Sequence, residues 1–120
     1  MNTRHSYTDD SGCYSVGYIC TSRNITRKTL FYYDRIGLLK PTVRSGSQQF
    51  KGYDSHAAER LDRILLCRSA GLSISEIRKL LDDRQCDRKS VMNRALERLI
   101  REREEKDREI AVLKEMISLE

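Results

Sequence analysis

The C-terminal third of the chain carries an apolar repeat that strongly limits the folds open to it. Residues 87–120 contain neither glycine nor proline. Within them, mainly apolar residues recur at spacings that alternate strictly between four and three residues. This pattern predicts one long helix with a coiled-coil seam. The seam positions are Met92, Leu96, Leu99, Arg103, Lys106, Ile110, Leu113 and Ile117.

A helix of this kind needs another helix beside it. Thirty-two residues of helix extend ~48 Å, which is too long to pack along one small domain. The polar pair Arg103 and Lys106 lies in the middle of the seam. A parallel pair would stack Arg103 on Arg103, so an antiparallel homodimer is favoured. The six apolar seam positions are then the dimerisation residues, although a solvated helix with accidental periodicity is the alternative.

Residues 15–36 predict two short helices joined by a tight turn. Ser15 is placed to cap the first helix, and Asn24 tolerates the left-handed backbone that a tight turn requires. Thr26 is a good N-cap for the second helix, and Ile25 and Leu30 have the spacing of a hydrophobic staple. Together these signals predict a helix-turn-helix.

The second of these helices places three aromatic residues in a row. At ~100° per residue, Tyr33 turns inward with Leu30, whereas Phe31 and Tyr32 turn outward. Three cations share the outward face: Arg27, Lys28 and Arg35. Cations meet phosphates, and a ring can contact a thymine methyl group, so a nucleic-acid groove would suit this face. The alternative is that a neighbouring element covers Phe31.

After this helix, the sequence pattern predicts a hairpin and two further helices. Gly37 and Pro41 end the helix, and β-favouring residues around Ser-Gly-Ser in 42–53 indicate a basic hairpin, either a DNA-binding wing or a plain structural hairpin. A third helix starts at Asp54 or Ser55 and ends near Gly71. A fourth follows the capping box from Ser73 to Glu76 and extends through Leu81.

Charge and composition narrow the class of protein. Residues 23–51 hold seven basic residues and one acidic residue, a local charge of +6, which indicates a polyanionic partner. No apolar run approaches the ~20 residues of a membrane span, and the polar N-terminus shows no secretory signal. A cytoplasmic protein is therefore expected. The four cysteines form no C-x-x-C pair and there are only two histidines, so we expect no metal site.

These segments together resemble the MerR family of bacterial transcriptional regulators. The resemblance rests on YSVGYI (14–19), ITRKTLFYYDRIGLLKP (25–41), FKGY (50–53), AERLDRI (58–64) and AGLSISEIRKLL (70–81), followed by the long helix. It implies a mostly α fold with a disordered tail at 1–13, a winged helix-turn-helix domain at 14–84 and an antiparallel dimerisation helix at 85–120. It also implies a homodimer that binds a pseudo-palindromic promoter in double-stranded DNA, distorts it, and acts with RNA polymerase.

Together with the exposed face described above, the resemblance implies a set of DNA-binding residues. They are Thr26, Arg27, Lys28, Phe31, Tyr32, Arg35, Arg44, Phe50 and Lys51. Phe31 is the largest departure, because the family commonly places arginine there. We therefore expect an altered site preference rather than a loss of DNA binding.

The signal that such a regulator would sense is not visible in the sequence. Cys86 is the best candidate for a redox-sensing thiol. Arg84 and Arg88 near it favour the thiolate, whereas Asp83 and Asp87 oppose it. A thiol-responsive or metal-responsive regulator that uses Cys86 is an alternative. Cys20 and Cys67 are expected to be core residues, and Cys13 is expected to be exposed in the tail. We expect no cofactor. The chain has no nucleophile–base pair or phosphate loop that would indicate an enzyme. The remaining alternative to a DNA-binding regulator is a protein-interaction module.

Overall fold

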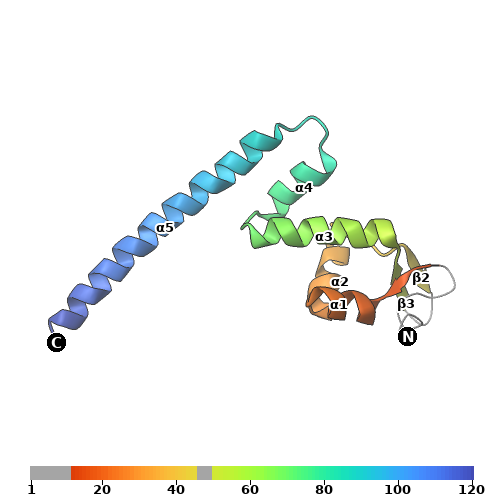
Figure 1. The fold of residues 1–120 in the computed structure, drawn as a ribbon, viewed down its shortest axis with the longest axis horizontal. Helices are drawn as coiled ribbons and strands as arrows, with labels where there is room; N and C mark the ends of the chain where they lie inside the picture. The colour runs from red at the N-terminus through yellow and green to blue at the C-terminus, as the bar shows by residue number, and fades with distance from the viewer. Residues whose placement is uncertain (1–11, 46–49) are drawn as a thin grey trace. The chain divides into compact units, whose positions relative to one another are not determined.

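The computed structural model describes residues 12–45 and 50–120, and it leaves the side chains of Ser45 and Phe50 undescribed. The chain forms two compact units, residues 1–66 and 67–120, with a small sheet in the first and a long C-terminal helix in the second (Figure 1). The elements in chain order are β1 (Tyr14–Ser15), α1 (Val16–Arg23), α2 (Arg27–Arg35), β2 (Val43–Ser45), β3 (Phe50–Tyr53), α3 (Ser55–Ser69), α4 (Ile74–Asp82) and α5 (Arg88–Ser118).

The predicted helix-turn-helix is confirmed, and each of its helices is capped by a side chain just before its first turn. The Ser15 hydroxyl accepts a hydrogen bond from the Tyr18 N–H at 3.1 Å, and the Thr26 hydroxyl accepts one from the Thr29 N–H at 3.1 Å. Each satisfies a donor that the first turn of a helix leaves unpaired. Between the helices, Asn24 adopts the left-handed conformation with φ 55°.

The hairpin is also confirmed, as two strands of a three-stranded antiparallel sheet in the order β1-β3-β2. Arg44 lies directly opposite Lys51 in the register of β2 and β3. The predicted turn around Gly46 lies outside the described residues. The pairing of β1 with β3, in which Tyr14 lies opposite Tyr53, was not predicted.

The core of the first unit is built from apolar side chains of the helices, the sheet and the loop after α2. Tyr33 is buried as predicted. The prediction that Cys13 is exposed in a tail is wrong, because its side chain is only 2% exposed. Pairing of β1 with β3 draws the preceding residue into the unit; residues 1–11 lie outside the described part. The fully buried side chains of this unit are Ile19, Leu30, Leu38, Leu39, Tyr53, Leu61 and Ile64.

In the second unit, α4 packs beside the first half of α5. The Arg98 guanidinium donates to the Glu76 carboxylate at 2.6 Å and to the Gly71 carbonyl at 2.9 Å. The Leu99 side chain lies so close to Gly71 that a methyl group on that glycine would be 3.2 Å from Leu99 Cδ2. These contacts place α4 in one compact unit with α5. The expected division into domains between residues 84 and 85 stays a prediction.

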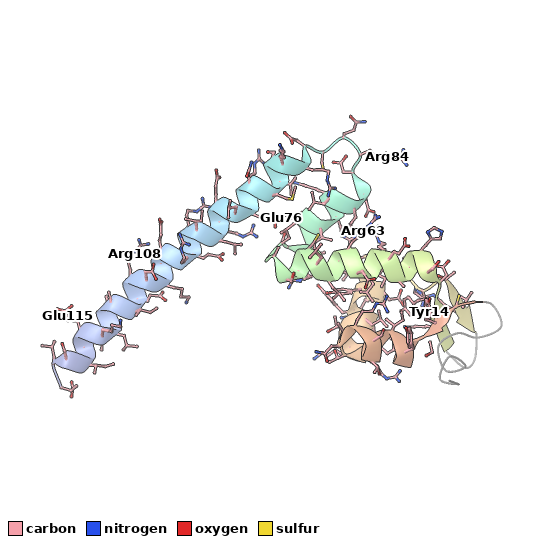
Figure 2. All side chains as sticks on the ribbon, viewed as in Figure 1. Tyr14, Arg63, Glu76, Arg84, Arg108 and Glu115 are labelled. Carbon is pink, nitrogen blue, oxygen red and sulfur yellow. The ribbon has the colours of Figure 1, made fainter. Side chains whose placement is uncertain are left out.

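The predicted long helix is confirmed as α5, whose 31 residues form one uninterrupted helix (Figure 1). Asp87 caps it by accepting a hydrogen bond from the Ser90 N–H at 3.3 Å. Ala95 is its one buried residue, and every residue from 101 to 120 is exposed within this single chain. Figure 2 shows the side chains of Arg108 and Glu115 standing out from the second half of this helix.

Candidate nucleic-acid interface

The outer face of α2 carries cations with no acidic partner among the described residues. Arg27, Lys28 and Arg35 are all exposed, as predicted. Tyr32 is also exposed, at 39%, and the Arg35 guanidinium lies 5.3 Å from the centre of its ring. The helix therefore presents three uncompensated positive charges and an aromatic ring to solvent.

The two described cations of the wing, which is the β2–β3 hairpin, are paired with a buried acid. Asp34 on α2 accepts hydrogen bonds from Arg44 Nη2 at 2.6 Å and Arg44 Nη1 at 2.9 Å. The Lys51 ammonium lies 3.2 Å from the second Asp34 oxygen. Arg44 and Lys51 are opposite one another across the hairpin, where like charges repel. The Asp34 carboxylate between them offsets that repulsion.

The charge of Asp34 is stabilised by these two partners. Its pKa is lowered mainly by the hydrogen bonds from Arg44, although burial opposes this, and the Lys51 ammonium lowers it further. The same interaction raises the pKa of Arg44. Asp34 is thus ionised at neutral pH, and it ties the wing to α2.

Phe31 does not lie freely exposed on the outer face of α2. Its side chain is half-buried, and the Lys51 ammonium lies 4.1 Å from the centre of its ring. The alternative given above, that a neighbouring element covers Phe31, is closer to the structure than full exposure. A cation at this distance from a ring is attracted to the negative face of the ring.

Behind this face, two buried groups are held in their neutral forms. The Tyr53 hydroxyl is fully buried and has no hydrogen-bond partner within the described residues. Burial, together with the nearby Asp34 charge, raises the pKa of Tyr53 to about 12. Burial also raises the pKa of the Cys20 thiol, against the opposing effect of Arg27. Cys20 is therefore a core residue, as predicted.

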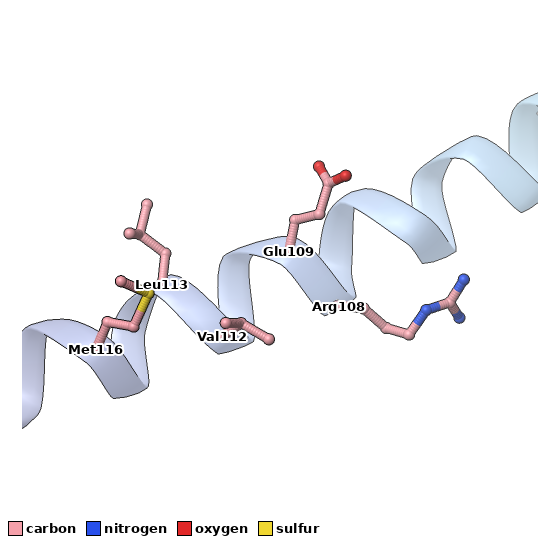
Figure 3. Close-up of a pocket in the computed structure, with 5 residues that line it drawn as sticks. All are labelled: Arg108, Glu109, Val112, Leu113 and Met116. Atoms are coloured by element: carbon pink, nitrogen blue, oxygen red, sulfur yellow. The ribbon is translucent and has the colours of Figure 1, made fainter.

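The predicted dimerisation residues form an exposed apolar face on α5. Their side chains are between 37% and 67% exposed in the single chain. A second apolar group, which was not predicted, lies beside this seam in the C-terminal half: Val112, Met116 and Leu119. Two of them line a shallow hollow with Arg108, Glu109 and Leu113 (Figure 3).

The cysteines outside the first unit show no grouping that would make a reactive site. The Cys86 thiol is half-buried and donates a hydrogen bond to the Lys79 carbonyl at 3.2 Å. Cys67, predicted to be a core residue, is also only half-buried in the single chain. In the part of the chain that the structure describes, no three His, Cys, Asp or Glu side chains gather as metal ligands. No helix there is long and apolar enough to cross a membrane.

Comparison with protein families gives two overlapping matches. Residues 14–84 match the family described as MerR HTH family regulatory protein. Residues 58–118 match the family described as MerR, DNA binding. The first of these matches alone covers more than half of the chain.

Individual relatives agree with these matches. The HTH-type transcriptional activator TipA of Streptomyces coelicolor is 37% identical over 86 residues, which are 72% of this chain and 34% of TipA. The HTH-type transcriptional regulator ZntR homolog of Haemophilus influenzae is 31% identical over 101 residues, which are 82% of this chain and 74% of that protein. The chain therefore spans about a third of the length of TipA.

A solved structure shows that the likeness extends to the fold. The N-terminal part of Mta, the multidrug transporter activator of Bacillus subtilis, superimposes with a TM-score of 0.73 at 27% sequence identity. The match covers 87% of this chain and 97% of that one. It supports the arrangement of a winged helix-turn-helix followed by a long helix.

Proposed function

Because this chain belongs to the MerR family of helix-turn-helix regulatory proteins, we propose that it binds double-stranded promoter DNA and regulates transcription. The observation that carries the proposal is the outer face of α2, where Arg27, Lys28 and Arg35 have no acidic partner in the described structure. Cations on the second helix of a helix-turn-helix are placed to meet phosphates while the helix enters the major groove.

Two such helices are needed to read a pseudo-palindromic site, and α5 is the element that would join them. Its exposed seam would be covered by the same helix of a second copy, with the polar Arg103 and Lys106 meeting near the centre of an antiparallel pair. Two recognition helices held in this way would contact half-sites about one DNA turn, ~34 Å, apart. The dimer would distort the promoter and so change how RNA polymerase engages it. This action would take place in the cytoplasm.

The proposal is tested by measuring duplex affinity as a function of salt, together with sedimentation equilibrium. A dimer that neutralises ~6–10 phosphates should lose ~10³–10⁵ in affinity between 50 and 200 mM salt. Fragments recovered from genome-wide mapping of bound sites should bind more tightly than unrelated duplexes of equal length. A monomer at micromolar concentration that ignores duplex DNA in dilute buffer would overturn the proposal.

The second candidate, a protein-interaction module, predicts a different salt response. Its affinity for a protein partner need not fall steeply with salt, because no condensed counterions are released. A thiol-responsive regulator that uses Cys86 stays a prediction. It requires that oxidation of Cys86 changes DNA affinity and that Cys86→Ser abolishes the change.

A further inference from the structure

We propose that Lys51 is a positioning residue that holds the wing against α2 through Phe31 and Asp34, and that it does not neutralise a DNA phosphate. This inference rests on the proposed DNA-binding function. It gives Lys51, which was predicted to contact DNA directly, a different role. It also gives a role to Phe31, the residue at which this chain departs most from its family.

The geometry shows one ammonium group held from two sides. Phe31 and Asp34 are three residues apart on α2, so their side chains are neighbours on the helix surface. The Lys51 ammonium reaches both, at 4.1 Å from the centre of the Phe31 ring and 3.2 Å from the Asp34 carboxylate. Its side chain is only 20% exposed. Because most of this side chain is withdrawn from solvent, a phosphate has little access to the ammonium.

Arg44, the other described cation of the wing, is in a different position. Its side chain is 51% exposed although it makes two hydrogen bonds to Asp34. A guanidinium has five N–H donors, so Arg44 retains donors that can reach a phosphate. Of the two cations that Asp34 binds, only Lys51 is withdrawn from solvent.

Removing Lys51 from its position would disturb the groups that remain. Asp34 is only 8% exposed, and a buried carboxylate that loses a partner is destabilised. An arginine at position 31 would remove the ring that the Lys51 ammonium faces and would place a second cation beside it. Phe31 and Lys51 are therefore a coupled pair, and a substitution of either should disturb the wing in the same way.

The decisive test compares the salt dependence of duplex binding in Lys51→Met and in the matched control Lys28→Met. Lys28 is exposed on α2 and has no acidic partner in the described structure. Its loss from both copies of a dimer should reduce the slope of log affinity against log salt by ~1.8. For Lys51→Met we expect the slope to change by less than ~0.5, while Kd rises ~3-fold to 10-fold at every salt concentration. A slope reduced as much as in the control would overturn the proposal.

Coupling between the two residues gives a second measurement. Phe31→Leu keeps an apolar side chain but removes the ring, so its Kd should rise by about the same factor as that of Lys51→Met. The double variant should be little weaker than either single variant, because both remove one interaction. Lys51→Arg retains a cation that can reach both the ring and the carboxylate. Unlike Lys51→Met, it should therefore bind the duplex with wild-type affinity. Fully additive effects, or no rescue by arginine, would contradict the coupled pair.

A measurement without DNA separates this inference from the proposed function. In the free protein, the NMR signals of the Lys51 side-chain methylene next to the ammonium should be shifted upfield by the Phe31 ring, relative to those of Lys28. The shift should disappear in Phe31→Leu. Absence of the shift in the wild type would overturn the positioning role, whether or not duplex binding is observed. If the shift is present but the wild type ignores duplex DNA, the proposed function is the part that fails.

Discussion

The α2–wing region and the C-terminal half of α5 differ in how far their side chains are buried and paired within one chain. In the first, a buried carboxylate at Asp34 pairs with two cations, and the helix beneath it rests on fully buried residues such as Leu30. In the second, every side chain from 101 to 120 is exposed, including the apolar seam. One region is complete within a single chain, and the other has no partner there.

This difference indicates where each region obtains its stability. The α2–wing region gains it from packing and ion pairs inside the chain, which do not depend on concentration. The second half of α5 has few tertiary contacts, and an isolated helix of that length is marginal in water. If α5 pairs with a second copy, its stability follows from mass action. The following substitutions test that contrast.

The largest effect is expected from Leu113→Glu in the seam of α5. Each of two copies would lose burial worth ~2 kcal/mol or more, so the dimer dissociation constant should rise at least ~1,000-fold. Ala111→Glu is the matched control, because two residues along a helix turn a side chain to the opposite face. Sedimentation equilibrium measures both. Equal weakening by the two variants would exclude the predicted seam.

A smaller but still large effect is expected from Leu30→Ala in the core of the first unit. Leu30 is fully buried, and truncation of such a leucine costs ~2–5 kcal/mol of unfolding free energy. Leu119→Ala, at a side chain that is 78% exposed, should cost less than ~0.5 kcal/mol. Urea denaturation at one fixed protein concentration compares them. A large loss in Leu119→Ala would show that the end of α5 is buried in solution.

An intermediate effect with a defined pH dependence is expected from Glu76→Gln. Hydrogen bonds from Arg98, and from the Ser73 N–H, lower the pKa of Glu76 from 4.5 to about 2. Because the folded state lowers this pKa, its stabilisation is complete above pH 4.5 and is lost as the pH falls toward 2.

The variant should therefore lose ~1–2 kcal/mol at pH 7 and should approach the wild type in acid. Thermal unfolding across this pH range measures the difference. Glu97→Gln is the control, since Glu97 is exposed on α5 and has no ion pair in the described structure. A difference between Glu76→Gln and the wild type that stayed constant down to pH 2 would rule out the ionised carboxylate as its source.

The smallest effect is expected from Gly37→Ala after α2. Gly37 has φ 76°, a left-handed conformation that disfavours alanine by about 1 kcal/mol. Gly17→Ala is a contrasting control, because Gly17 lies within α1 at negative φ. A methyl group there would make only ordinary van der Waals contacts, with Arg27 Nη2 at 3.6 Å and Ser15 Oγ at 4.0 Å. Alanine in a helix should be neutral or stabilising by up to ~1 kcal/mol. The same sign for both in chemical denaturation would contradict this account.

The features that the sequence predicted correctly depend on neighbouring residues. The caps at Ser15 and Thr26, and the capping box at Ser73, each join groups three residues apart. The heptad pattern of α5 likewise follows from spacing along one helix. Signals of this kind need no knowledge of how distant segments meet, so they could be interpreted without the structure.

The features that were missed depend on contacts between distant segments. Asp34 pairs with Arg44 and Lys51 because the register of the hairpin brings both toward α2. One signal was present, since Asp34 is the single acidic residue among seven cations in residues 23–51. The two-residue strand β1 gave no signal, because its pairing with β3 spans almost 40 positions. The burial of Cys13 follows from that pairing and was missed with it.

The exposed stripe on α5 also has a consequence for the abundance of this protein in a cell. If α5 pairs with a second copy, a newly made protomer displays that stripe to proteases and chaperones until another copy binds, and the encounter rate scales with the square of the protomer concentration. Slow synthesis would then favour degradation, whereas faster synthesis would favour accumulation. The steady-state level of the regulator should therefore rise more steeply than its rate of translation.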